Sequence, residues 1–146
     1  MDERLPGADA VAAPEGLILL SSGTRYEQAV FIGNELYSDR RPAYVVQPES
    51  IDDVASALRF ARERSLPFSI KCGGHSYAGY CLNSGGLLLD LSLMRRLEID
   101  EASMTVRADA GVRWLSVYEE LAKVSPSYVV MGGICPDVGI SGAVLG

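Results

Sequence analysis

Residues 43–71 constrain the fold more than any other stretch, because they set a helix pattern between two strand patterns. Residues 43–47 are β-branched and aromatic and stop at Pro48, which is typical of a strand, and residues 68–71 form a similar run. Between them, Ser50 can cap a helix whose first turn is acidic. The apolar residues of that helix recur at helical spacing: Ile51, Val54, Ala55 and Leu58. Two strands joined by a helix form a crossover unit, so the sequence predicts that they are parallel.

The remaining patterns complete one domain with an α+β fold, a small mixed sheet and two main helices. The other predicted elements are a short helical or irregular segment at 26–37, a buried strand at 87–91, a hairpin of 97–99 with 104–108, a helix at 112–123 and a final strand at 128–131. We interpret residues 1–38 as a leader, flexible over its first 22 residues, followed by that short helical segment. Residues 39–146 then form the domain proper.

Composition excludes several classes of function. The formal net charge is −6 and the pI is about 4.7, so the chain lacks the basic surface that nucleic acids and anionic membranes attract. No stretch approaches the roughly 18 consecutive apolar residues of a membrane-spanning helix, and the acidic N-terminus lacks the basic region of a signal peptide. The sequence therefore predicts a soluble, intracellular protein without nucleic-acid or membrane partners.

Two glycine-rich segments carry the candidate chemistry. The first, residues 71–80 (KCGGHSYAGY), follows a predicted strand and holds His75, the only histidine. Adjacent glycines let several backbone N–H groups point at one centre, which favours anions, although the segment matches neither the Walker A nor the GxGxxG pattern. The second, residues 132–146, holds Cys135 next to Pro136 among five glycines. A cysteine on such a loop is accessible, as a nucleophilic thiolate needs to be.

Three interpretations of these segments stay open on residue chemistry alone. Each glycine pair can be a tight turn without further function. The side chains of Cys72, His75, Cys81 and Cys135 form a Cys₃His set suited to zinc, although their spacing is not that of a standard zinc finger. A dinucleotide cofactor is the third interpretation, with its pyrophosphate on the first loop and its reactive ring near His75 and Cys135.

Four motifs resemble, in order and spacing, the N-terminal flavin-binding half of the berberine bridge enzyme-like oxidoreductases, which belong to the vanillyl-alcohol oxidase / p-cresol methylhydroxylase (PCMH) superfamily. The motifs are Arg41-Pro42-Ala43, Gly73-Gly74-His75-Ser76-Tyr77 with Gly79, Leu89-Asp90-Leu91-Ser92, and Gly133-x-Cys135-Pro136-x-Val138-Gly139-x-x-Gly142. The resemblance covers residues 41–146. It implies the first subdomain of a PCMH-type FAD-binding fold.

The same resemblance implies FAD as the cofactor, often held by two covalent bonds. His75 would bond the 8α-methyl carbon of the flavin, and Cys135 would bond flavin C6. Backbone amides of the first loop would cradle the pyrophosphate, while residues of the second loop would pass close to the flavin and its ribityl chain. The implied cofactor-binding residues are Gly73, Gly74, His75, Ser76, Tyr77, Gly79, Cys135, Val138, Gly139, Ser141 and Gly142.

The function that this resemblance implies is oxidation of an alcohol, sugar or alkaloid-type substrate by hydride transfer to flavin N5, with molecular oxygen commonly reoxidising the flavin. No motif assigns a catalytic base. Family members continue beyond the position of Gly146, so we expect a truncated chain that is inactive alone and that self-associates through an uncovered apolar face. Cys72 stands where the family usually has Gly or Ser. The alternative is a non-catalytic remnant or a partner-binding module.

Overall fold

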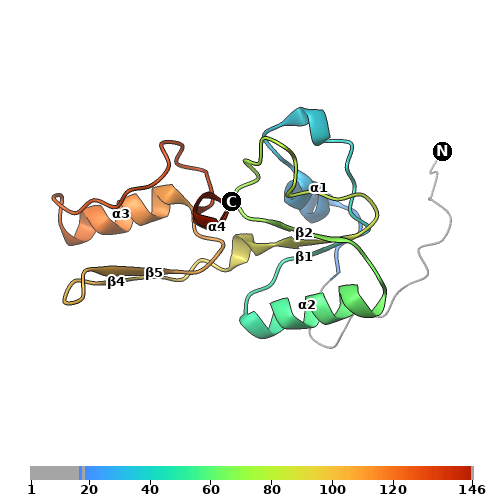
Figure 1. Cartoon of the computed structure of the whole chain (residues 1–146), viewed down its shortest axis with the longest axis horizontal. Coiled ribbons are helices and arrows are strands. Elements are labelled where there is room, and N and C mark those ends of the chain that lie inside the picture. The colour runs from blue at the N-terminus through green and yellow to red at the C-terminus, as the bar shows by residue number, and fades with distance from the viewer. Residues whose placement is uncertain (1–16, 18, 146) are drawn as a thin grey trace.

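The computed structural model describes residue 17 and residues 19–145, and within them the chain forms two lobes (Figure 1). In chain order the elements are α1 (Thr24–Val30), η1 (Glu35–Tyr37), β1 (Tyr44–Val46), α2 (Ile51–Glu63), β2 (Phe68–Lys71), β3 (Leu87–Asp90), η2 (Leu91–Leu93), β4 (Leu97–Asp100), β5 (Thr105–Ala108), α3 (Trp114–Val124) and α4 (Ile140–Leu145). We call residues 17–93 the sheet lobe and residues 94–145 the hairpin lobe. Most of the predicted flexible leader lies outside the described residues.

The sheet lobe is built on three parallel strands in the order β1-β3-β2. Leu87 of β3 pairs with Tyr44 on one side and with Phe68 on the other. The prediction that the two strands of the crossover unit are parallel is therefore confirmed, but β3 lies between them. The continuous apolar sequence of β3 explains this place, because a central strand with both faces covered needs apolar side chains on both faces.

Helix α2 begins where the sequence predicts. The Ser50 hydroxyl accepts a hydrogen bond from the Asp53 backbone N–H, and the Asp53 carboxylate accepts one from the Ser50 N–H, which together form a capping box. The predicted apolar face packs on the sheet except at its first residue. Ile51 is 79% exposed, whereas Leu58 packs against the cluster that contains the buried Ala57 and Ala61.

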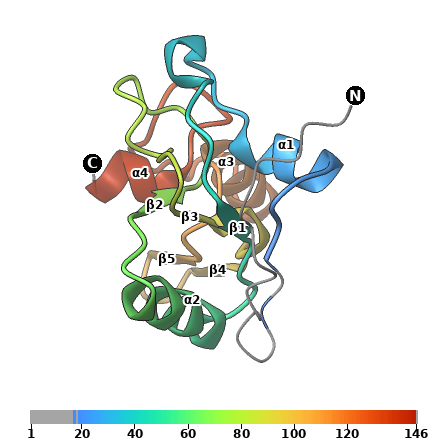
Figure 2. The same ribbon diagram turned by 90° about the vertical axis from the view of Figure 1, so that its right-hand side faces the viewer.

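Two apolar clusters cover the two faces of β1 and β3, with α1 on one face and α2 on the other, while Phe68 and Ile70 of the edge strand β2 remain exposed (Figure 2). Side chains alternate along β3, so Leu88 packs with α1 while Leu87 and Leu89 pack with α2. Leu20 pairs with Val45 in an antiparallel bridge, which adds part of the N-terminal segment to the edge of the sheet.

The hairpin lobe has only two layers, a two-stranded hairpin and one helix. Strands β4 and β5 form the predicted antiparallel hairpin, and α3 packs on one face of it. The cluster between them is centred on Val112, Trp114, Val117 and Leu121. Burial alternates along both strands, so the outer face of the hairpin remains open.

Two predictions for the C-terminal part were wrong. Residues 128–131 form no strand; Tyr128 and Val130 instead pack against the apolar cluster of α3. The glycine-rich tail was interpreted as loop throughout, yet Ile140–Leu145 forms the short helix α4. No helix in the described residues is long and apolar enough to cross a membrane.

Candidate cofactor site

The first glycine-rich segment forms a tight loop, the glycine loop (residues 72–80), which leaves the carboxyl end of β2. Gly74 and Gly79 have φ angles of 74° and 66°, in the left-handed region that favours glycine. A Cβ on Gly79 would overlap the ring of Tyr37. The Ser76 hydroxyl accepts from the Tyr80 N–H at 3.2 Å and closes the turn. The left-handed backbone at Gly74 and Gly79 and the close contact with Tyr37 therefore favour glycine at these two positions.

Side chains that the sequence did not single out hold this loop against α1 and η1. The Asn34 amide donates to the Tyr77 carbonyl at 2.7 Å, and the Arg40 guanidinium donates to the Gly79 carbonyl at 2.7 Å. The Gly33 N–H donates to the Gly74 carbonyl at 3.2 Å. No sequence signal pointed to Asn34, which lies in a segment interpreted as helical or irregular, or to Arg40, which stands between that segment and the first predicted strand.

The second loop, which we call the cysteine loop (residues 132–139), caps the start of α3. The N-cap of α3, Arg113, makes no side-chain capping bond. Instead, the Trp114 N–H donates to the Val138 carbonyl at 3.1 Å and the Leu115 N–H donates to the Pro136 carbonyl at 3.0 Å. The first free N–H groups of a helix need such acceptors, so the loop and the helix stabilise each other.

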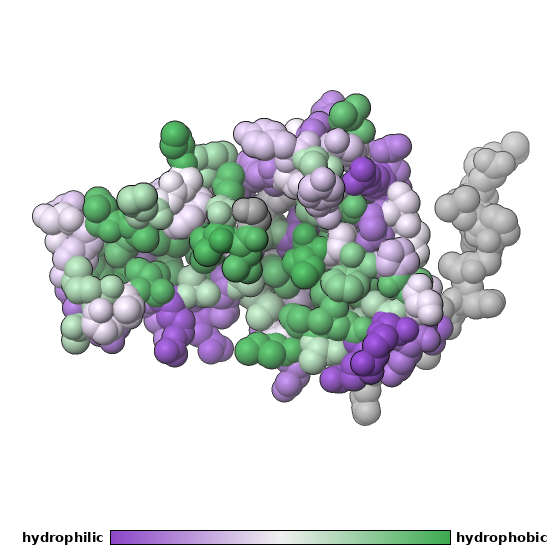
Figure 3. All heavy atoms as spheres, viewed as in Figure 1, coloured by the Kyte–Doolittle hydropathy of each residue, from purple (hydrophilic) through white to green (hydrophobic). Residues whose placement is uncertain are grey.

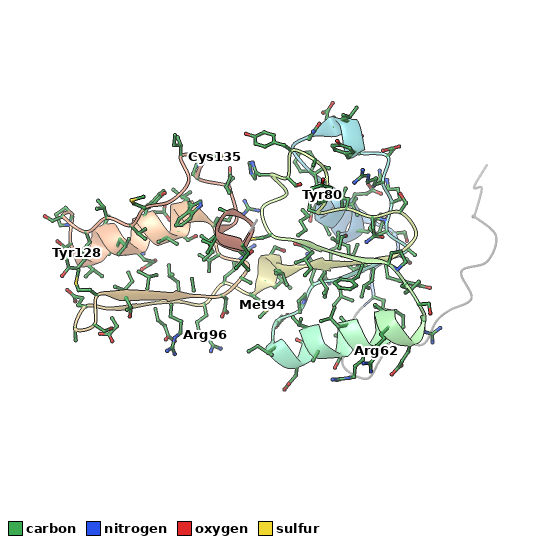
Figure 4. The ribbon with its side chains drawn as sticks, in the orientation of Figure 1. Arg62, Tyr80, Met94, Arg96, Tyr128 and Cys135 are labelled. Carbon is green, nitrogen blue, oxygen red and sulfur yellow. The ribbon has the colours of Figure 1, made fainter. Side chains whose placement is uncertain are left out.

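Contacts on the other side of Cys135 hold the start of this loop. The Tyr118 hydroxyl donates to the Gly133 carbonyl at 2.8 Å. A Cβ on Gly132 would lie 2.6 Å from the Trp114 ring, so only glycine allows this approach. Cys135 therefore projects from a loop that is hydrogen-bonded on both sides (Figure 4).

The two loops touch through their glycines. A Cβ on Gly73 would lie 2.7 Å from the Gly139 nitrogen and would overlap the Asp137 carbonyl. A Cβ on Gly139 would overlap the Cys72 side chain. The structure thus brings the two predicted segments together at their backbones. His75 follows Gly73 and Cys135 precedes Gly139 in the chain, and both side chains are exposed.

The other predicted site residues have different environments. The Ser141 hydroxyl donates to the Ala110 carbonyl at 2.7 Å, so it can only accept a hydrogen bond from a cofactor while this bond is formed. Val138 is half-buried, whereas nothing lies within 4 Å of a Cβ built on Gly142. Tyr77 is 92% exposed.

The four candidate zinc ligands do not assemble. In the described residues, no group of three or more His, Cys, Asp or Glu side chains could hold a metal ion. Cys81 is buried in the core of the sheet lobe and Cys135 is exposed on the cysteine loop. Burial raises the pKa of the thiols of both Cys72 and Cys81. The zinc interpretation is therefore wrong.

Comparison with known proteins decides the family. The sequence matches the FAD binding domain family over residues 42–146. The chain belongs to this family. It is 37% identical over 106 residues to (R)-6-hydroxynicotine oxidase of Paenarthrobacter nicotinovorans, a match that covers 73% of this chain and 23% of that protein.

Solved structures agree with this assignment. The fold resembles that of 6-hydroxy-D-nicotine oxidase from Arthrobacter nicotinovorans with a TM-score of 0.82 and 29% identity, over 90% of this chain and 28% of that one. It also resembles BBE-like 1 of Physcomitrella patens, with a TM-score of 0.80 and 28% identity, over 87% of this chain and 28% of that one. The predicted fold class and the resemblance to berberine bridge enzyme-like FAD-linked oxidoreductases are confirmed. The chain spans about a quarter of the length of these relatives.

Proposed function

We propose that this FAD-binding domain holds its cofactor where the glycine loop and the cysteine loop touch. The contact between Gly73 and Gly139 carries the proposal, because two backbones that approach so closely leave no room for side chains. Among the residues that the structure describes, the N–H groups of Gly74, His75 and Tyr77 donate no hydrogen bond. Consecutive free N–H groups on a glycine turn suit a pyrophosphate, so the residues present fit FAD.

His75 and Cys135 are the residues that we propose to bond the flavin, through an imidazole nitrogen and a thiolate respectively. Both side chains are exposed, and they lie on the two loops that touch. Each bond-forming reaction needs an unprotonated nucleophile that the flavin can reach. The buried thiols of Cys72 and Cys81 are poor candidates, because burial raises the pKa of each.

The bound flavin would supply the redox chemistry by accepting a hydride from an alcohol, sugar or alkaloid-type substrate. The described residues hold and orient the cofactor, but they leave both candidate attachment side chains open to water. Figure 3 shows apolar side chains gathered over the hairpin lobe and along the middle of the molecule. We therefore propose that this chain alone binds FAD and does not turn over substrate.

The experiment that tests the site is acid precipitation of the purified chain after incubation with FAD. Flavin that stays in the precipitate is covalently bound, and peptide mapping assigns it to a residue. We expect flavin on His75 and Cys135 in the unmodified chain, on Cys135 alone in His75→Ala, and none in the double variant with Cys135→Ala.

Cys72→Ser is the matched control, because it replaces the thiol of the glycine loop with a hydroxyl of similar size, which keeps a side chain against Gly139 and leaves both proposed attachment residues unchanged. This variant should retain flavin. Attachment that survives in the double variant, or a chain that neither attaches FAD nor binds it reversibly, would refute the proposed site.

Self-association is a second candidate property, favoured by the exposed apolar side chains of the C-terminal part. Met131 is 97% exposed and Leu145 is 86% exposed, and Val129 and Ile134 are exposed as well. Large apolar patches of this kind commonly mark contact surfaces. Sedimentation velocity over a hundredfold range of concentration should show a rising mass, and Met131→Ser with Ile134→Ser should reduce that rise.

A further inference from the structure

A polar cavity of about 420 Å³ opens at the carboxyl edge of the three-stranded sheet. It is lined by residues that follow or end the strands, by α1, and by the start of α3. Crevices outside the carboxyl ends of parallel strands are frequent ligand sites, and this volume falls within the usual range for small ligands. The cavity shares only Cys72 with the two loops described above.

The charges around this cavity oppose the charge of the whole chain. Its lining includes four cationic side chains and one carboxylate, Asp90, although the chain as a whole carries −6. The cationic side chains are Arg25, Lys71, Arg95 and Arg113. Asp90 is buried and already accepts hydrogen bonds from the Gln47 amide at 2.9 Å and from the Ser92 N–H at 3.3 Å. The local excess of positive charge therefore faces the cavity.

Lys71 is the unusual member of this group, because it is only 7% exposed. Its ammonium donates to the Ala29 carbonyl, and it forms no ion pair within 4.0 Å in the described part of the chain. Burial lowers the pKa of Lys71. The nearby negative charge of Asp90 acts in the opposite direction but does not cancel this effect. A buried cation without a close counter-ion is costly, and an anion in the cavity would offset that cost.

Two of the arginines also lack a carboxylate partner among the described residues. Arg25 donates to the neutral Gln47 amide at 3.0 Å, and Arg95 donates to the Ser92 carbonyl. Arg113 alone is ion-paired, with Asp137 at 3.0 Å. Guanidinium groups bind tetrahedral oxyanions through paired N–H donors, so Arg25 and Arg95 suit a ligand of that shape.

We propose that this cavity is an anion-binding site for a phosphate-class oxyanion, with Lys71 at its base and Arg25 and Arg95 at its rim. The anion is either free or the phosphate group of a larger molecule. This site is distinct from the glycine turn at Gly73–Gly74 and does not depend on flavin attachment.

The test is a calorimetric titration of the whole chain with inorganic phosphate, at constant ionic strength and without FAD. We expect saturable binding at one site. Arg25→Gln and Arg95→Gln should each weaken it about tenfold, which corresponds to about 1.4 kcal/mol, the size of one charge-assisted hydrogen bond. Both side chains are exposed, so these variants should fold. Lys71→Met should abolish phosphate binding if the variant folds. If it does not fold, the two arginine variants test the proposal.

Arg62→Gln is the matched control, because it removes one positive charge from α2, on the other side of the sheet from α1 (Figure 4). It should bind phosphate as the unmodified chain does. A second phosphate titration with FAD present distinguishes the two sources of the anion. If FAD weakens phosphate binding, the natural ligand is the phosphate group of the nucleotide. If phosphate binding is unchanged, the ligand is a separate oxyanion. Absence of saturable binding, or equal weakening by Arg62→Gln and Arg25→Gln, would overturn the proposal.

Discussion

The central strand of the sheet lobe and the strands of the hairpin lobe are buried to very different degrees. Leu87, Leu88 and Leu89 of β3 have no exposed surface, because helices cover both faces of the sheet. In the hairpin lobe, every second side chain of β4 and β5 is exposed, and only one face is covered. The glycine loop leaves β2, an edge strand with exposed Phe68 and Ile70 that pairs with the fully buried β3, whereas the cysteine loop depends on a hairpin and one helix.

This difference bears on the two candidate attachment residues. His75 follows an edge strand whose one neighbour, β3, is packed between two apolar clusters. Cys135 lies on a loop whose geometry depends on bonds to the first turn of α3 and to Tyr118. We therefore expect disturbances of the hairpin lobe to affect Cys135 first.

The test with the largest expected effect removes one core leucine from each lobe. Leu88→Ala should lower the free energy of unfolding by about 3–5 kcal/mol, and Leu121→Ala by about 2–3 kcal/mol, because a cavity in a two-sided core collapses less readily. Urea unfolding measures both. The only tryptophan, Trp114, reports on the hairpin lobe, and circular dichroism reports on the whole chain. Equal losses would show that the two lobes are packed equally tightly.

The second test separates the lobes at the point where they touch. Gly73→Ala would place a methyl group 2.7 Å from the Gly139 nitrogen, so the two loops must move apart. We expect FAD affinity to fall at least tenfold and stability to fall by about 1–3 kcal/mol, as for other overpacked sites.

Gly33→Ala is the control for that change. The nearest atom to its added Cβ is the Gly74 carbonyl oxygen at 4.0 Å, so alanine fits there without overlap. This variant should keep both its FAD affinity and its stability. If both glycine variants bind FAD equally, the contact between the loops does not form part of the cofactor site.

Sequence patterns predicted the sheet lobe well, because its signals are local. The capping residues of α2 and the continuous apolar run of β3 each determine one element by themselves. The position of β3 between β1 and β2 could not be predicted, since strand order depends on packing between distant segments. The strand predicted at 128–131 was wrong for a similar reason, because Tyr128 and Val130 pack against the apolar cluster of α3, a contact that no local pattern shows.

The candidate site was predicted in part. Glycine spacing and family motifs indicated both loops, but only the structure shows that Gly73 and Gly139 touch. Lys71 was missed altogether, because a lysine at the end of a strand normally extends into solvent. Its buried ammonium donates a hydrogen bond to the Ala29 carbonyl of α1, which lies far away in the sequence.

A third test compares the thiols of the two loops. Cys135 is exposed, whereas burial raises the pKa of the Cys72 thiol. We expect iodoacetamide at pH 8 to alkylate Cys135 at least tenfold faster than Cys72, because the thiolate is the reacting species. Mass spectrometry of peptides over time gives both rates in one sample. Equal rates in the folded chain would mean that the loops open together.

The next test compares how the main helix of each lobe begins. Ser50→Ala removes the side-chain cap of α2 and should cost about 1 kcal/mol. Arg113→Ala, at the corresponding position of α3, should cost less than about 0.5 kcal/mol, because it removes only an exposed ion pair with Asp137. Thermal unfolding of both variants measures the difference. A larger loss from Arg113→Ala would mean that the side chain, and not the backbone of the cysteine loop, holds the start of α3.

The smallest effect concerns the other half of the α2 cap. Hydrogen bonds from the N–H groups of Glu49 and Ser50 hold the pKa of Asp53 below its usual range. A carboxylate with a lowered pKa stabilises the folded state above its unfolded pKa of roughly 4, and this contribution disappears as the pH falls through the lowered value. Asp53→Asn should therefore reduce stability at pH 7 by less than about 0.5 kcal/mol, since water screens this exposed group, and should have no effect near pH 2. A stability difference that persists unchanged to acid pH would show that the amide disturbs the cap by its shape, and that the charge of Asp53 contributes nothing to the start of this helix.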